Sequence, residues 1–187
     1  MVRLGFIVEG DSEKIVIESV KFREFLRLNG FELVTPVVNA KGGGNLLPQN
    51  IEAYLQALQH KNIEQIVVLT DLEGEASIAD VRTRIAHADI SVIFVAVKAL
   101  EAWFLSDTDA LRSWLGDPHY IEPQPEQTAE MPWDRLKEIA AQLGKRGPGN
   151  KVGFAKKMVK NGFCVTRAAQ HGSCASAHEL VDWFENQ

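Results

Sequence analysis

Cysteine is scarce in this sequence, and long apolar runs are missing. Only two cysteines, Cys164 and Cys174, occur in 187 residues, which is too few for a disulfide framework. We therefore expect a cytoplasmic protein, because the cytosol is reducing and its proteins rarely contain disulfides. No apolar run approaches the roughly 20 residues that span a bilayer, so no membrane partner is expected. The short apolar stretch of residues 3–8 is followed at once by acids, which makes it a poor signal peptide and a good buried strand.

Acidic residues are missing from one long segment. No Asp or Glu occurs between Glu138 and Glu179, although the whole chain carries a net charge of −5. The charged residues inside this segment are all basic: Lys145, Arg146, Lys151, Lys156, Lys157, Lys160 and Arg167. Such a tract can attract phosphates through its local field even on an acidic protein. A solvated helix face would show the same pattern, so both interpretations stay open.

Strand-like and helix-like segments alternate regularly over the first 115 residues. Four segments have the composition of strands: 3–8, 31–38, 65–70 and 91–97. Four others carry apolar residues at helical spacing: 14–28, 47–58, 78–88 and 99–114. This alternation predicts an α/β fold with a Rossmann-like, mainly parallel four-stranded sheet flanked by helices. Pro36 should shorten the second strand or push it to an edge of the sheet.

From residue 116 onward the pattern changes. Four prolines fall within 15 residues, which predicts a long loop, and long loops in compact domains are often functional. The remaining sequence predicts helices over 134–143, 151–160 and 177–185. We therefore expect residues 1–115 to form the α/β domain. Residues 116–187 should form a proline-rich loop and a basic helical extension packed on that same domain.

Charged side chains follow three of the expected strands. Glu9 follows the first strand, Asp71 and Glu73 follow the third, and Lys98 and Glu101 follow the fourth. The carboxyl ends of parallel strands meet at one edge of a sheet, where ligands usually bind. Carboxylates that converge there repel one another unless they are protonated or neutralised by a cation. Oxygen ligands without cysteine or clustered histidine favour Mg²⁺ or Mn²⁺ over zinc.

Simpler roles explain some of these polar residues. Asp11, Ser12 and Glu75 are better interpreted as residues at helix N-termini, where they complement the helix dipole. Glu9 and Asp71 come directly after buried strands, so for them we favour metal binding. The run from Lys41 to Gly44 could approach a phosphate, but it lacks the Lys-Ser/Thr ending of a P-loop. A flexible turn is the better interpretation of that run.

The same motifs resemble a known family. Val8-Glu9-Gly10 after the first strand, with Asp71-x-Glu73-Gly74 after the third, resembles the Toprim domain of topoisomerases, primases, recombination-repair proteins and overcome-lysogenization-defect (OLD) nucleases. The Toprim signature is a glutamate after the first strand and Asp-x-Asp after the third, which together bind Mg²⁺. Glu73 stands where aspartate is usual, which keeps the ligand type and lengthens the arm. Glu13 and the block from Glu101 to Asp107 resemble the OLD branch and small stand-alone Toprim-like proteins of uncharacterised function.

The resemblance implies metal-assisted cleavage of phosphodiester bonds. Glu9, Asp71 and Glu73 would hold one Mg²⁺ or Mn²⁺ ion, and Glu13 and Glu101 are candidates for a second. The resemblance also implies that catalytic roles would fall to Glu9, Asp71, Lys98 and Lys151. The two lysines would offset charge on the phosphate. The basic tract from Lys145 to Arg167 would then track a nucleic-acid backbone.

Two other functions compete with a nuclease. Larger relatives carry an ATPase, whereas this chain has no P-loop, so it could be the effector subunit of an ATPase-coupled phage-defence system. The alternative is a non-catalytic or weakly active Toprim-fold subunit that binds or regulates an ATPase partner. A receiver-like phosphate-signalling domain fits less well, because the residues around Glu9 do not match that pattern. The sequence gives no signal for an oligomeric state.

Overall fold

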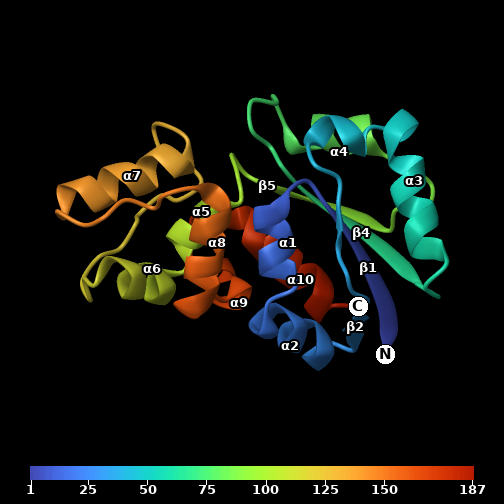
Figure 1. Ribbon diagram of the computed structural model, residues 1–187, viewed down its shortest axis with the longest axis horizontal. Helices are drawn as coiled ribbons and strands as arrows, with labels where there is room; N and C mark the ends of the chain where they lie inside the picture. The colour runs from blue at the N-terminus through green and yellow to red at the C-terminus, as the bar shows by residue number, and fades with distance from the viewer.

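A parallel β-sheet forms the centre of the molecule (Figure 1). The structure is a computed structural model that describes residues 1–187. The strands are β1 (Val2–Val8), β2 (Phe31–Leu33), β3 (Val38–Asn39), β4 (Gln65–Asp71) and β5 (Val92–Ala96). Their order is β2-β1-β4-β5, β3 also pairs with β1, and every pair is parallel. The predicted α/β fold with a parallel sheet and flanking helices is confirmed.

The two central strands are apolar on both faces because helices cover both faces. Phe6 of β1 and Val67 of β4 belong to the larger core cluster, and their neighbours Ile7 and Val68 belong to the smaller one. Successive side chains of a strand point to opposite faces, so a strand buried on both sides reads as a continuous apolar run. This is why residues 65–70 were recognisable as a strand.

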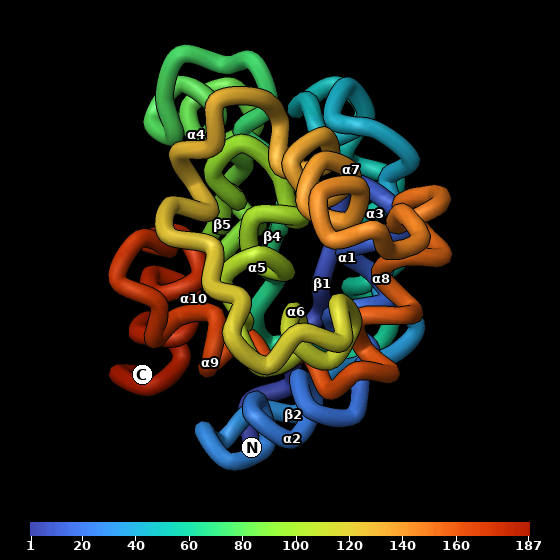
Figure 2. Tube along the Cα trace, turned by 90° about the vertical axis from the view of Figure 1, so that its left-hand side faces the viewer, coloured from blue at the N-terminus to red at the C-terminus, as the bar shows by residue number.

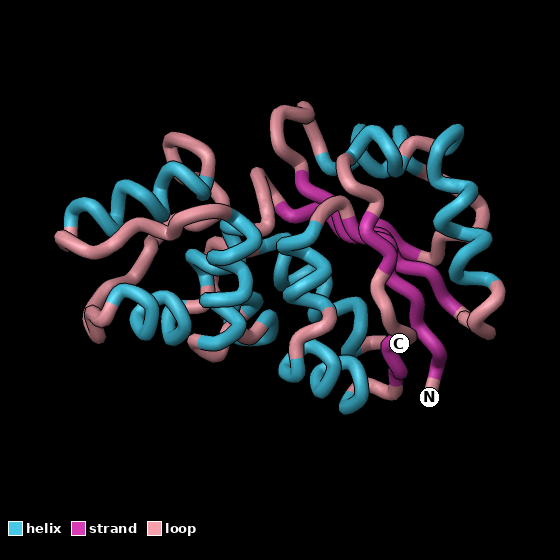
Figure 3. The backbone as a smooth tube through the Cα atoms, viewed as in Figure 1, coloured by secondary structure: helices cyan, strands magenta, loops and turns pink.

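Two helices cover the smaller cluster, and the remaining helices contribute to the larger one. The first two are α3 (Pro48–Gln59) and α4 (Ile78–Ile85). The other face of the sheet is covered by α1 (Asp11–Ile17), α2 (Val20–Leu28) and α10 (Ala175–Glu185). The larger cluster continues to the left of the strands in Figure 1, into α5 (Glu101–Ser106), α6 (Thr108–Leu115), α7 (Pro132–Gln142), α8 (Lys151–Lys160) and α9 (Val165–Ala169). Figure 3 shows this unequal division, with most of the helical mass on one side of the strands. No helix is long and apolar enough to cross a membrane.

Two helices that were predicted as continuous are each broken by a capping residue. The segment 14–28 divides into α1 and α2, because the Ser19 hydroxyl accepts a hydrogen bond from Phe22 N at 3.3 Å and starts a new helix. The segment 99–114 divides into α5 and α6 at Asp107, whose carboxylate accepts from Ala110 N at 3.3 Å. Apolar periodicity continues through both breaks, so the pattern alone did not show them.

Other boundaries also differ from the prediction. The segment 31–38 forms two short strands, β2 and β3, on either side of Pro36, and β2 is an edge strand as expected. A short 3₁₀ helix at Gly43–Leu46 precedes α3, and within it the Asn45 side-chain amide donates to the Ala40 carbonyl at 2.7 Å. The short helix α9 was not predicted.

The C-terminal helices share a core with the sheet. The Phe184 ring of α10 lies 5.1 Å from Phe31, 5.9 Å from Phe94 and 6.4 Å from Phe6, measured between ring centroids. Figure 2 shows the proline-containing segment 116–131, in yellow to gold, running along the outside of the molecule from α6 to α7. The division at residue 115 stays a prediction, and one apolar cluster contains residues from both sides of it.

Candidate metal centre

A polar cavity of about 530 Å³ lies at the carboxyl ends of the strands. Figure 3 shows the strands running from the N-terminal corner toward the middle of the molecule, where the helical part begins. Residues that line the cavity are Glu9, Gly10, Asp11, Ser12, Glu13, Asn39, Lys41, Gly42, Asp71, Glu73, Glu101, Lys151 and Val152. All five acidic residues predicted as metal ligands are among them. The five acids that the sequence pattern singled out therefore lie around the same cavity.

Glu9 is held at the end of β1 by donors from β4. Its Oε2 accepts hydrogen bonds from Asp71 N at 3.1 Å and from the Thr70 hydroxyl. The backbone of Gly43 passes close by, and a Cβ built at that position would lie 3.2 Å from Glu9 Oε1. Glycine at position 43 therefore leaves room beside this carboxylate.

Asp71 is the last residue of β4 and points toward the start of α5. Its Oδ1 accepts from Leu100 N at 2.8 Å. Burial, followed by the negative charges of Glu13, Glu101 and Glu9, raises the pKa of Asp71 well above its ordinary value. The charged form of this side chain is therefore disfavoured in the metal-free protein.

Glu13 lies one helical turn after Glu9, on α1, and is only 6% exposed. Desolvation raises the pKa of Glu13 to about 7, and the charges of Glu101 and Glu9 add to the effect. A Cβ at Gly10 would approach Glu13 Oε2 to 3.0 Å, so glycine at that position gives this carboxylate its space.

Glu101 begins α5 and is 2% exposed. Its Oε1 lies 3.3 Å from the ammonium of Lys151, the first residue of α8. Its Oε2 is buried and has no hydrogen-bond partner. An unpaired buried carboxylate oxygen is costly and is rarely retained without a function. Desolvation lowers the pKa of Lys151, but the charges of Glu101, Asp71 and Glu13 outweigh it and raise that pKa.

These side chains have the donor chemistry that a hard cation requires. Four carboxylates from β1, α1, β4 and α5 face one cavity, two of them have raised pKa values, and one oxygen lacks a partner. As the side chains stand, no three acidic, histidine or cysteine residues converge on a single point that could hold an ion. The residues fit Mg²⁺ or Mn²⁺ by ligand type, and some carboxylates would have to turn to close around it.

Three strand ends share an unusual backbone feature. Lys41, Glu73 and Lys98 each lie two residues beyond the end of a strand, and each has a left-handed φ, of 58°, 46° and 61°. This conformation costs a residue other than glycine about 1 kcal/mol. Such strain gathers at functional sites. Glu73 lines the cavity but is exposed, and only its backbone N is engaged, with the Lys98 carbonyl at 2.8 Å.

Lys98 is not brought to the acidic cluster. Its ammonium donates to the carbonyls of Glu130, at 3.0 Å, and Thr128. It therefore fastens the proline-containing segment to the end of β5. Lys98 does not line the cavity, so the structure gives it an anchoring contact where the sequence suggested a catalytic one.

The basic tract is divided between several positions. Among its members only Lys151 lines the cavity. Lys145 and Arg146 are exposed between α7 and α8, Lys156 and Lys160 are exposed on α8, and Lys157 is half-buried there.

Arg167 is engaged inside the protein. Its guanidinium makes two hydrogen bonds to the fully buried Asp107, at 2.9 and 2.8 Å, and these raise the pKa of Arg167. The Asp107 carboxylate also accepts from Cys164 N at 2.7 Å. The structure therefore places Arg167 in an internal ion pair that links α6 and α9.

Two residues of the site were missed as functional candidates, and a third, Lys41, was interpreted as part of a flexible turn. Thr70 donates to Glu9, Asn39 donates to Asp11 at 2.7 Å, and Lys41 lines the cavity. Thr70 is a polar residue inside an otherwise apolar strand, directly before Asp71, and that was the available signal. Asn39 and Lys41 follow the second predicted strand, 31–38, whose pairing with β1 only the fold reveals.

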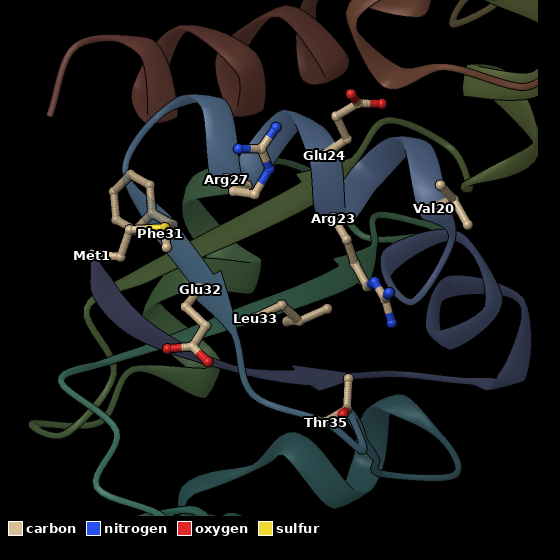
Figure 4. Close-up of a pocket in the computed structure, with 9 residues that line it drawn as sticks. All are labelled: Met1, Val20, Arg23, Glu24, Arg27, Phe31, Glu32, Leu33 and Thr35. Atoms are coloured by element: carbon tan, nitrogen blue, oxygen red, sulfur yellow. The ribbon is translucent and has the colours of Figure 1, made fainter.

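A second cavity, of about 460 Å³, lies at the opposite end of the sheet. It lies between α2 and β2, where Met1 and Phe31 mark the amino ends of two strands (Figure 4). Arg23 and Arg27 of α2 line it beside apolar side chains, and none of the predicted site residues does. This cavity is therefore separate from the acidic site.

Comparison with known proteins gives one structural match to report. No family model matches the sequence, and no curated protein matches it. Among solved structures, the C-terminal region of the Burkholderia pseudomallei OLD protein matches at 19% identity and a TM-score of 0.48, over 100% of this chain and 98% of that chain.

Proposed function

We propose that this protein is a nuclease that requires Mg²⁺ or Mn²⁺. The observation that carries the proposal is the convergence of Glu9, Glu13, Asp71 and Glu101 on one cavity, with the buried Glu101 Oε2 left unpaired. Mutual repulsion and desolvation make this cluster unfavourable without a cation, and metal binding would relieve both. The choice of phosphodiester cleavage rests on the motifs that resemble the Toprim family.

Each residue has a role that its position supports. Glu9, Glu13, Asp71 and Glu101 would hold the metal, and the exposed Glu73 could turn toward it. When bound, the metal would supply Lewis acidity that makes water a better nucleophile and offsets charge on the phosphate oxygens. The Thr70 hydroxyl and the Asp71 backbone N fix the orientation of Glu9.

Lys151 is the basic residue best placed to meet a phosphate at the reacting centre. Its ammonium lies 3.3 Å from Glu101 Oε1, and its side chain is about half exposed at the mouth of the cavity. In this position it holds Glu101 and could also offset charge on a substrate oxygen. We do not extend a catalytic role to Lys98, because its ammonium is engaged with loop carbonyls.

Nucleic acid would approach along the exposed part of the basic tract. Lys145, Arg146, Lys156 and Lys160 are exposed near or on α8, the helix that begins with Lys151 at the cavity. Lys157 is half-buried and could contribute less. Arg167 is left out of this surface, because it is paired with buried Asp107. Contacts of this kind attract a phosphate backbone without reading its sequence.

Cleavage of plasmid DNA and of labelled RNA, in Mg²⁺ and in Mn²⁺, tests the proposal. We expect Glu9→Gln and Asp71→Asn to lower the cleavage rate by at least about a hundredfold, because each change removes a charged ligand. Glu24→Gln, an exposed carboxylate on α2 at the other end of the sheet, serves as the matched control. Unchanged cleavage in both site variants, with folding verified by circular dichroism, would rule out a nuclease centred on this cluster.

One observation favours the alternative of a non-catalytic subunit for an ATPase partner. Glu9, Asp71 and Glu101 are each engaged with protein donors, and no three acids surround one point. A purified chain that binds metal but cleaves neither nucleic acid would support this alternative. Cleavage by the chain alone would exclude it.

A further inference from the structure

We propose that Lys41 is a phosphate-binding residue of the metal cavity, contacting the nucleic-acid backbone beside Glu9. This inference rests on the proposed nuclease function and assigns a residue that the sequence pattern alone had favoured as part of a flexible turn. Lys41 lines the cavity from the segment that follows β3, whereas Lys151 lines it from α8. The two lysines therefore enter the same cavity from different elements.

Of the two lysines that line the cavity, Lys41 is the one whose ammonium has no partner. Its side chain is exposed, and its ammonium takes part in no hydrogen bond or ion pair. The ammonium of Lys151, in contrast, is paired with Glu101. A lysine without a partner next to an acidic cavity is available to a ligand that the cavity attracts.

The backbone that carries Lys41 is fixed to Glu9. Gly42 N donates to the Glu9 carbonyl at 2.8 Å, and Lys41 N donates to the Asn39 side chain at 2.7 Å. The Asn45 amide donates to the Ala40 carbonyl on the other side of the turn. The turn is therefore held in place, and the start of the Lys41 side chain is set relative to the metal ligand Glu9.

Lysine is conformationally unfavourable at position 41. The φ of Lys41 is 58°, a left-handed conformation that glycine adopts without penalty, and three glycines follow immediately. Gly42, at φ 124°, is in a region that excludes other residues. A sequence that needed only a flexible turn would gain stability from glycine at 41. The strained lysine is therefore better explained by its ammonium than by its backbone.

The ligand class follows from the charges around the cavity. Six acids line it, against two lysines. A phosphodiester carries one negative charge on two oxygens and could enter only where cations face it. Metal ions would neutralise part of the acidic cluster, and an ammonium on the β3 side would contact a backbone phosphate as a point charge.

The test measures binding of a fluorescein-labelled single-stranded DNA of 20 nucleotides, with Ca²⁺ in place of Mg²⁺ so that binding is observed without turnover. The variants are Lys41→Gln, Lys41→Arg, and Lys61→Gln as the matched control. Lys61 lies in the connection between α3 and β4, outside the cavity. A titration with Mn²⁺ alone is run on each protein as the second readout.

We expect Lys41→Gln to weaken DNA binding by about threefold to tenfold and to reduce the slope of log K against log salt by about 0.7, the loss of one phosphate contact. Lys41→Arg should restore the slope, Lys61→Gln should leave it unchanged, and Mn²⁺ binding should be the same in all four proteins. DNA binding and slope that are equal in Lys41→Gln and Lys61→Gln would overturn the role of Lys41, while intact Mn²⁺ binding would leave the proposed metal site standing. Absence of Mn²⁺ binding in the unchanged protein would overturn both.

Discussion

Glu13 shows most clearly what the acidic cluster costs at the scale of a single residue. It is almost fully buried on α1, and its only cation at close range, Lys151, is shared with Glu101. Because the pKa of Glu13 is raised to about 7, the folded protein holds a proton there that the unfolded chain releases near pH 4.5. Between these two pH values the folded state binds more protons, so the contribution of Glu13 to stability falls as pH rises.

The variant Glu13→Gln should therefore stabilise the metal-free protein at pH 8. The gain is expected to be on the order of 2 kcal/mol, and it should vanish at pH 4, where both proteins carry a neutral side chain at this position. Urea unfolding from pH 4 to 8, in the presence of a chelator, measures the difference. A variant that is less stable than the unchanged protein at pH 8 would show that Glu13 is stabilising as a carboxylate and would contradict the strained cluster.

At this scale the sequence was informative about which acidic residues share the cavity and uninformative about their hydrogen-bond partners. Glu9 and Asp71 could be predicted because an acid directly after a buried apolar strand is a local signal. The contacts of Lys98 and the position of Lys41 beside Glu9 could not, because they depend on how distant segments of the chain pack together. Lys98 is bound by the carbonyls of a loop some 30 positions away, whereas Lys41 comes beside Glu9 through the pairing of β3 with β1.

At the scale of elements, Asp107 explains both the break between α5 and α6 and the link between α6 and α9. Its carboxylate caps α6, accepts from Cys164 N and binds Arg167 of α9, all while being fully buried. The periodicity of residues 99–114 predicted one helix, because α5 and α6 both present apolar faces to the same core. The break at Asp107 could not be predicted, because the donors that stabilise its buried carboxylate, Cys164 N and Arg167, lie about 60 residues later in the chain.

Asp107→Asn should therefore destabilise the protein by about 3 kcal/mol, because it leaves the Arg167 charge without its buried partner. Asp109→Asn provides the control. Asp109 lies 3.6 Å from the same guanidinium, but its side chain is 70% exposed, and exposed pairs contribute under about 1 kcal/mol. Chemical unfolding of both variants gives the comparison. Equal losses for the two variants would mean that Arg167 is not held by Asp107, and that it belongs with the exposed basic residues after all.

At the scale of the whole molecule, the order of the strands builds the site. Since β4 lies between β1 and β5, Glu9 and Asp71 become neighbours, and Glu101 lies at the start of α5, the helix that follows β5. The alternation of strands and helices predicted a parallel sheet, but a pattern along the chain does not determine the order of the strands within that sheet. The C-terminal helices complete the assembly: α8 packs against α1 and brings Lys151 to the cavity.

The central claim is that the carboxylates at the ends of β1 and β4 bind a divalent metal, and a calorimetric titration with Mn²⁺ tests it most directly. The unchanged protein should give a saturable heat. Asp71→Asn should lower the affinity by about tenfold or more while remaining folded, and Glu24→Gln should bind as the unchanged protein does. No saturable heat in the unchanged protein, or the same affinity in Asp71→Asn, would contradict the metal site.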